Sequence, residues 1–381
     1  MKKISYILAA LAMTGMLSAC SGNQSAAESS ATISTETVTK PSAAESTVAA
    51  FTEAATDSTN PPTHDAISIP IPSTADTASI IPEDVTVRIG SLKGPTSMGL
   101  VWLMEQSEKG EAVNQYEFTM VTAADELLAK MVSGELDVAL IPANVASVLY
   151  NKTQGKIAVI AINTLGVLDI VAADDSIQSI ADLKGKTVYM TGKGTTPDYV
   201  FRYLLSGNNM SEADLTLEFK SEPTEVAALL KEQPDAIGLL PQPFVTAACA
   251  QNESLKIVLD LTEEWEKIQS DSKSRLVTGV TIVRRPFLEE NPNAVAVFLT
   301  EHQASAAFTH SNPDAAAEQI ASLGIIEKAP IAKKALPYCN ITCLTGEEMK
   351  TALSGYLQVL YEQDPASVGG KLPEDDFYFQ K

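Results

Sequence analysis

From residue 85 onward, short β-branched runs alternate with segments of helical spacing, and this alternation constrains the fold more than any other feature. The run Val85–Gly90 alternates in the manner of a β-strand. In the stretch 98–108, apolar residues recur at intervals of three and four, as in an amphipathic helix. Continued alternation of strand and helix is typical of parallel sheets covered by helices. The sequence therefore predicts an α/β fold.

The other expected elements follow the same pattern in two series. Strands are predicted at 116–121, 137–141, 157–162, 168–172, 187–190, 215–219, 236–240, 255–259 and 279–283. Helices are predicted at 124–133, 145–151, 196–206, 224–232 and 244–251, and nearly everything between 286 and 362 is predicted to be helical. A late strand followed only by helices favours a chain that returns to its first lobe and ends there.

The first twenty residues indicate export from the cytoplasm. Two lysines precede the apolar run 4–16, which is too short to span a membrane. The run ends in Leu-Ser-Ala before Cys20, which resembles the lipobox of bacterial lipoproteins. An ordinary secretory signal cut near Ala19 is the alternative. We expect residues 1–19 to be a signal peptide and Cys20 to be acylated, anchoring the protein on the extracytoplasmic face of the cell membrane.

Residues 20–82 have the composition of a tether. Ser, Thr and Ala make up more than half of the stretch after Cys20, which contains a single aromatic residue, Phe51. Such a segment cannot bury enough apolar surface to offset its ordering entropy, so we expect it to be disordered. A mucin-like or binding segment is the alternative.

The charge balance excludes one broad class of partner. Lys and Arg total 27 against 48 acidic residues, which gives a formal net charge of −21. A surface this acidic repels phosphate backbones, so we expect no nucleic-acid partner. Four cysteines and three histidines are too few and too scattered for a zinc scaffold. We expect neither a metal nor another cofactor, and we expect a monomer.

Three segments carry a family resemblance. They are the turn Gly94–Ser97 after the first strand, the segment Asp182–Val188 and the strand residues Thr278–Val280. Together with the lipobox and the tether, they are similar to solute-binding lipoproteins of ABC importers, and most similar to the nitrate, sulfonate and thiamine-precursor group. The resemblance covers about residues 84–380. Many periplasmic-type binding proteins share the Asp-Leu-Lys-Gly-Lys sequence, so it identifies the superfamily better than the ligand.

The resemblance implies both a fold and a role. The fold is the type II periplasmic-binding-protein fold, in which two lobes, each a mostly parallel sheet flanked by helices, are joined by two crossover strands. Here the crossovers would fall near 168–172 and 278–283. One lobe would comprise 83–170 and 278–381, and the other 171–277. A small solute would be held between the lobes and passed unaltered to a membrane permease driven by an ATPase.

The expected site lies at the strand-to-helix turns of both lobes. In open α/β sheets, ligands collect at the carboxyl ends of strands, where helix N-termini present free N–H groups. The candidate ligand-binding residues are Gly94, Pro95, Thr96, Ser97, Asn144, Asn163, Thr164, Thr191, Gly192, Lys193, Thr195, Thr196 and Gln242. Thr96, Asn144 and Thr196 could instead be plain N-caps, and Lys193 a solvated surface charge.

The chemistry of these turns narrows the range of candidate solutes only slightly. Helix dipoles favour a polar or anionic ligand. Sulfonates, a pyrimidine thiamine precursor and other small carboxylates or heterocycles are therefore the candidates. The candidate turns contain no arginine, which weakly favours an aromatic heterocycle over a bare oxyanion.

Two other classes of function stay open. Two-lobed enzymes of the pyrimidine-synthase and menaquinone-pathway types resemble this chain distantly, and a surface sensor or adhesin could share the lipobox. Enzyme motifs are incomplete, because Ile180 occupies the first glycine position of a phosphate loop and Pro197 the third of a dinucleotide fingerprint. His302 and His310, about 12 Å apart along a helix, are expected to be surface residues and not a catalytic pair.

The remaining cysteines allow two interpretations. Cys339 and Cys343 lie four residues apart between Pro337 and Gly346, where a turn could bring them within disulfide distance outside the cytoplasm. Two separate thiols are the alternative. Cys249 lies in a run of small residues and is expected to be a buried apolar residue.

Overall fold

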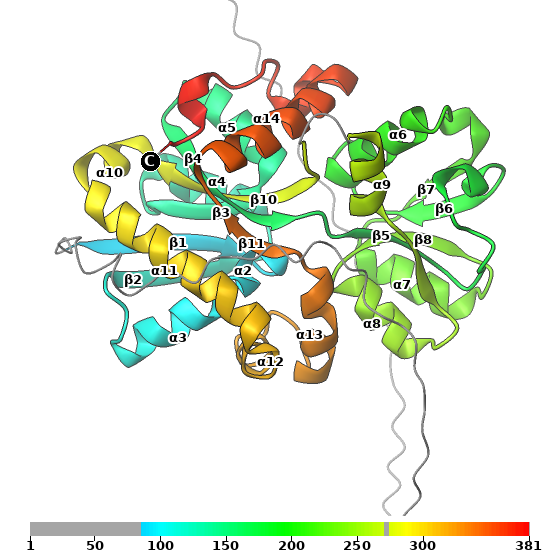
Figure 1. Cartoon of the computed structure of the whole chain (residues 1–381), viewed down its shortest axis with the longest axis horizontal. Coiled ribbons are helices and arrows are strands. Elements are labelled where there is room, and N and C mark those ends of the chain that lie inside the picture. Colours follow the sequence, from blue (N-terminus) through cyan, green and yellow to red (C-terminus); the bar gives the residue numbers. More distant parts are fainter. Residues whose placement is uncertain (1–84, 270–273, 381) are drawn as a thin grey trace, which may run out of the picture. The chain divides into compact units, whose positions relative to one another are not determined.

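The computed structural model describes residues 85–269 and 274–380 (Figure 1). The signal peptide expected at 1–19, the acylated Cys20 and the tether expected up to residue 82 lie outside this part of the chain. Within the described ranges, no helix has the length and apolar character that crossing a bilayer requires.

The described chain forms two β-sheets. The first has six strands in the order β11-β4-β10-β3-β1-β2, and the second has five in the order β7-β6-β8-β5-β9. The strands of the first sheet are β1 (Thr86–Leu92), β2 (Gln115–Val121), β3 (Val138–Pro142), β4 (Ile157–Leu165), β10 (Val277–Arg284) and β11 (Ile341–Leu344). Those of the second are β5 (Leu168–Ala172), β6 (Thr187–Met190), β7 (Thr216–Phe219), β8 (Ile237–Pro241) and β9 (Lys256–Asp260).

Helices connect the strands and cover the sheets. The α-helices are α2 (Pro95–Met98), α3 (Val101–Lys109), α4 (Ala124–Ser133), α5 (Ala143–Thr153), α6 (Thr196–Gly207), α7 (Pro223–Glu232), α8 (Phe244–Gln251), α9 (Leu261–Ile268), α10 (Arg285–Glu290), α11 (Pro292–Ser311), α12 (Pro313–Ser322), α13 (Ala329–Ala335) and α14 (Gly346–Gln363). Short 3-10 turns are η1 (Ile180–Leu183), η2 (Glu212–Asp214), η3 (Leu336–Tyr338), η4 (Pro365–Val368) and η5 (Asp375–Phe377).

Both sheets are mixed, but four of the six strands in the first sheet and four of the five in the second run in one direction, as expected. Strands β1, β2 and β3 pair in parallel, but β10 runs antiparallel to both of its neighbours, β3 and β4. In the second sheet β6 pairs in parallel with β7 and β8, whereas β5 is antiparallel to β8 and β9. The cause is the connectivity, because β5 and β10 each follow a passage from one sheet to the other. The α/β class itself is confirmed.

The hydrophobic core joins the two sheets. α4, α5 and α14 cover one face of the first sheet, and α3, α11 and α12 cover the other (Figure 1). One continuous cluster of buried side chains includes Val280 of β10 and Ile170 of β5, which belong to different sheets. An aromatic series adds to it, with ring centroids of Tyr203 and Trp265 4.7 Å apart and those of Trp265 and Tyr356 5.7 Å apart. Such pairs stabilise packing beyond the area they bury.

One strand was not predicted. β11 falls in the region after Pro286 that was predicted to be helical, and it pairs with the edge of the first sheet next to β4. Its four residues, Thr342 included, are all buried, so the strand shows no alternation of buried and exposed positions. A run this short cannot be distinguished from a helix segment by periodicity.

Candidate functional site

The turn after β1 is closed by its own hydroxyl groups. Thr96 Oγ1 donates to the carbonyl of Leu92 at 3.1 Å. Ser97 Oγ lies 2.7 Å from Ser91 Oγ and also donates to the Leu92 carbonyl. Both side chains are buried, and they fold the turn 94–97 back onto the end of β1. Ser97 is 0% exposed and Thr96 is 8% exposed, so of the two hydroxyl oxygens only that of Thr96 is placed to accept a hydrogen bond from a ligand.

A second polar group gathers where β4 ends beside the start of β10. Asn163 Nδ2 donates to Thr281 Oγ1 at 3.1 Å, and Thr164 Oγ1 donates to Asn163 Oδ1 at 2.8 Å. Gly279 allows this close approach, since a Cβ there would lie 2.5 Å from Asn163 Oδ1 and 2.8 Å from Thr96 Cγ2. The structure thus brings together the predicted Thr96, Asn163 and Thr164, which come from two strand ends.

Thr281 and Gly279 were not among the predicted site residues. Both lie on β10, the strand inserted between β3 and β4. The glycine within an otherwise β-branched run was the available signal, because such a glycine often marks a close approach of another group.

The loop 191–196 supplies the corresponding turn of the second sheet. Gly192 and Gly194 have φ of 77° and 70°, a region that favours glycine. A Cβ at Gly192 would also lie 2.5 Å from Thr195 Oγ1. The loop is tied to helix α6 by Asp198, whose Oδ2 accepts from the Gly194 N–H at 2.8 Å and whose Oδ1 accepts from Arg202 Nε at 2.6 Å. The two glycines therefore serve a tight turn at the start of α6.

Helices α5 and α6 meet through their first turns. Thr196 Oγ1 donates to Asn144 Oδ1 at 3.2 Å, and both side chains are half-buried. Asn144 Nδ2 also lies 3.4 Å from the carbonyl of Ser367. Neither helix has a side-chain cap hydrogen bond at its N-cap residue, which is Pro142 for α5 and Thr195 for α6. The two helices follow strands of different sheets, and the free N–H groups of their first turns therefore lie near the hydrogen bond between Thr196 and Asn144.

The N-cap interpretation of three candidates is wrong. Thr96, Asn144 and Thr196 all lie inside the first turn of their helices, and the N-cap residues are Gly94, Pro142 and Thr195. A proline or glycine cannot cap with its side chain, and Thr195 Oγ1 donates instead to the carbonyl of Gly192.

The structure gives Gln242 and Lys193 different environments. Gln242 is 1% exposed, and its amide is used internally, with Nε2 donating to Asp169 Oδ2 at 3.0 Å and Oε1 accepting from Thr246 Oγ1 at 2.8 Å. Lys193 is exposed, and its ammonium lies 5.6 Å from the centroid of the Phe219 ring. Thr191 is buried at the end of β6. Of these three residues, only Lys193 is charged, and it is exposed.

His302 corrects the prediction of two surface histidines. Its side chain is fully buried, stacked on Phe298 with ring centroids 5.4 Å apart, and Nδ1 lies 3.8 Å from Cys343 Sγ. Burial lowers the pKa of His302 to about 4, so the ring is neutral at ordinary pH. His310 is exposed and hydrogen-bonds to the carbonyl of Ile341.

The three cysteines in the described part of the chain are free thiols. Cys339 and Cys343 are both buried and unpaired, so the disulfide considered from the sequence is not formed in the structure. The reason is local, because Cys343 lies on β11 while Cys339 precedes that strand, at the end of η3. Cys249 is only partly buried, and burial raises the pKa of its thiol to about 11.

Comparison with known proteins adds a family match. Residues 157–316 match the family model described as NMT1/THI5 like. Proteins of Brucella abortus and Brucella suis that are named as binding proteins are 26% identical to this chain over 201 residues, which is 53% of the chain. The match covers 59% of the length of these curated relatives.

Solved structures show the fold. An ABC transporter protein of Parabacteroides distasonis superposes with a TM-score of 0.65 at 23% identity, covering 78% of this chain and 100% of that one. The periplasmic aliphatic sulphonate binding protein SsuA of Escherichia coli gives a TM-score of 0.61 at 17% identity, with coverages of 78% and 93%. The chain thus has the α/β fold of type II periplasmic binding proteins and carries an NMT1/THI5-like segment at residues 157–316.

Proposed function

We propose that this protein is the lipid-anchored solute-binding receptor of an ABC importer. It captures a small polar or anionic organic solute between the turns of its two sheets and delivers it unaltered to a permease and its ATPase. The anchor would be Cys20, on the extracytoplasmic face of the cell membrane, and the receptor would act as a monomer. Its lobes would comprise 83–170 with 278–381, and 171–277.

The observation that carries this proposal is the hydrogen bond between Asn144 and Thr196. These residues stand in the first turns of α5 and α6, which follow strands of different sheets. Uncapped helix N-termini attract anions and hydrogen-bond acceptors. A solute bound at this junction would contact both lobes at once, so it would favour the closed arrangement by its differential affinity.

The nature of the solute follows from the side chains at these turns. Hydroxyl and amide groups of Thr96, Asn144 and Thr196 supply directional hydrogen bonds, and Lys193 supplies a positive charge nearby in the sequence of the α6 turn. This set suits a sulfonate, a pyrimidine thiamine precursor or a similar small molecule. The likeness to an aliphatic sulphonate binding protein makes alkanesulfonates the first compounds to test.

A ligand screen tests the proposal. Thermal unfolding of the non-acylated Cys20→Ser chain is measured with alkanesulfonates, pyrimidines, vitamins and carboxylates. A ligand at one hundred times its Kd should add about 2.7 kcal/mol of stability. We expect a hit that is lost in Asn144→Ala and Thr196→Val and recovered unchanged after incubation. A hit that both variants retain would contradict the assigned site, and chemical conversion of the hit would contradict the receptor role.

A further inference from the structure

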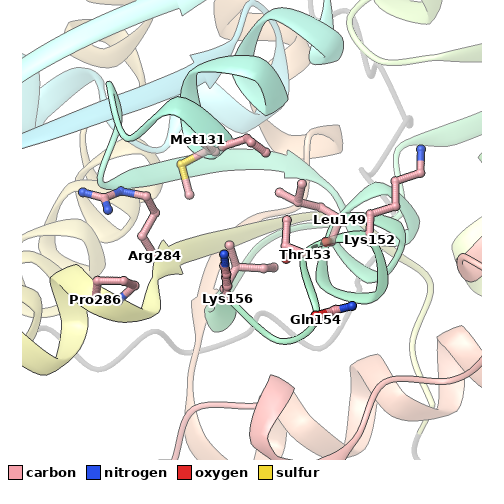
Figure 2. A pocket seen from close by; sticks show the side chains of 10 residues that line it. Met131, Leu149, Lys152, Thr153, Gln154, Lys156, Arg284 and Pro286 are labelled. Atoms are coloured by element: carbon pink, nitrogen blue, oxygen red, sulfur yellow. Dashed lines mark hydrogen bonds between the residues drawn. The ribbon is translucent and has the colours of Figure 1, made fainter.

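A pocket of about 430 Å³ lies where β4 begins and β10 ends, at the far end of these strands from the candidate solute site (Figure 2). Its lining includes Ile157, the first residue of β4, and Arg284, the last residue of β10, which are partners in the antiparallel ladder. The candidate site residues Asn163 and Gly279 lie toward the other ends of these same two strands. The pocket is therefore separate from the solute site proposed above, and its role does not depend on that proposal.

The base of the pocket is apolar. Met131, Leu149 and Ile157 are each less than 5% exposed and come from α4, α5 and β4. Val132 at the rim is 66% exposed, a high value for a large apolar side chain in this structure. Small-molecule sites typically combine an apolar lining with a few polar groups in a volume of roughly 300–1,000 Å³. The pocket meets this description in both size and lining.

The charged groups around this base are cationic, and Thr153 and Gln154 add neutral polar groups. Lys152 and Lys156 are exposed, and among the described residues neither forms an ion pair, although most other cations there do. Figure 2 shows Lys156 beside the lining residues just before β4 and Arg284 at the end of β10, whereas the Lys152 side chain extends from the end of α5 away from Lys156. Lys152 and Lys156 are thus available to a ligand.

Arg284 adds to this positive charge. Its Nη2 lies 2.7 Å from Asp137 Oδ1, and Arg88 Nη2 lies 2.7 Å from the same oxygen. The carboxylate of Asp137 is thus shared by two guanidinium groups, and Glu117 and Glu135 also act on Arg88. A concentration of cations here stands out in a chain of formal net charge −21.

We propose that this pocket is a second binding site, which takes a small organic anion with a short alkyl portion. The carboxylate or other anionic head would lie at Lys156, toward which the flexible side chain of Lys152 can also turn, and the alkyl part would cover Met131 and Ile157. We expect the ligand to need both its anionic head and its alkyl portion. An anion without an alkyl portion leaves the apolar base in contact with water, and a neutral alkane leaves the lysines without a counter-charge.

Hexanoate binding to the non-acylated full chain, measured by titration calorimetry or ligand-observed NMR, tests the proposal. We expect Lys152→Gln/Lys156→Gln to weaken hexanoate binding by about tenfold, because the charge at the head and the flexible second charge near it are both lost. The matched control is Lys328→Gln/Lys334→Gln, which removes two exposed lysines outside the pocket and should leave the affinity unchanged. Hexylammonium, which carries a positive instead of a negative charge, and acetate, which lacks the alkyl tail, should both bind more weakly than hexanoate.

Three results would overturn the proposal. The first is an absence of hexanoate binding to the unsubstituted chain, and the second is equal weakening by the two lysine pairs. The third is loss of hexanoate binding in Asn144→Ala/Thr196→Val, since that would place the anion at the junction of α5 and α6. Retention of binding in this last variant supports the second site whether or not the transport role holds.

Discussion

Thr196 Oγ1 donates a hydrogen bond to Asn144 Oδ1 at 3.2 Å, and this contact joins the first turns of α6 and α5. The two residues are 52 positions apart in the chain and follow strands of different sheets. The contact places a polar junction at the positive ends of two helices, where a bound solute would compete with, or add to, the hydrogen bond.

The first prediction concerns this pair. Thr196→Val and Asn144→Ala should each lower the free energy of unfolding by about 1 kcal/mol and weaken binding of the solute found in the ligand screen. A double-mutant cycle in the affinity should show coupling between the two substitutions. The surface pair Ser254 and Asn252, with Oγ and Oδ1 2.6 Å apart, provides the control, and its removal should not change affinity.

The second prediction concerns Gly279. Gly279→Ala places a methyl group within 3 Å of Asn163 Oδ1 and Thr96 Cγ2, so both side chains must move. We expect reduced solute affinity with an unchanged far-UV circular dichroism spectrum. Affinity equal to that of the unsubstituted chain would show that the group at the end of β4 does not contact the solute.

The third prediction concerns the buried carboxylate of Asp137. Its side chain is 1% exposed and accepts from Arg88 and Arg284. Asp137→Asn leaves two guanidinium groups without their anion, and we expect a loss of about 3 kcal/mol in urea unfolding. Asp314→Asn removes an exposed partner of Lys333 and should cost less than about 1 kcal/mol. Equal losses in the two variants would refute this account.

The fourth prediction concerns pH. The pKa of His302 is lowered from 6.5 to about 4 by burial. Below pH 6.5 the unfolded chain therefore binds a proton that the folded chain does not bind until about pH 4. This contribution to stability is present above pH 6.5 and declines as the pH falls to 4, by about 3 kcal/mol in total. Denaturant titrations should show a shallower decline for His302→Leu, whereas His310→Gln should keep it.

The fifth prediction concerns the thiols. Cys339 and Cys343 are free and buried, and burial raises the pKa of both, to about 12 for Cys343. We expect no labelling of either residue by iodoacetamide in the folded chain, and labelling of both in denaturant. Intact mass should not change on adding reductant. A gain of two hydrogens on reduction would indicate the disulfide instead.

Local patterns in the sequence predicted most helices and strands, because the preference of a segment for either structure depends mainly on its own residues. The helix predicted at 124–133 and the one at 244–251 agree with α4 and α8 in both bounds. The antiparallel direction of β5 and β10 was not predicted, since it depends on which strands become neighbours after the chain has passed between sheets. The same reason explains β11, whose identity as a strand depends on the edge of β4.

The site was only partly predictable for a related reason. The structure places Thr96, Asn144 and Thr196 in the turns after strands, as predicted, because strand ends and helix starts can be located from the sequence. Asn163 was predicted to follow a strand but lies within β4, which extends to Leu165. The internal use of Gln242 could not be foreseen, since its partner Asp169 lies 73 residues away. The burial of His302 likewise depends on the layer of helices that covers the first sheet.

The central position of β10 has a consequence for the order in which the protein can be made. β3 and β4 leave the ribosome early, but the strand that separates them comes only after all five strands of the second sheet. Until then, two inner strands of the first sheet have unpaired edges and cannot complete their hydrogen bonds. A nascent chain of this topology must therefore remain incompletely folded until residue 284 has been synthesised.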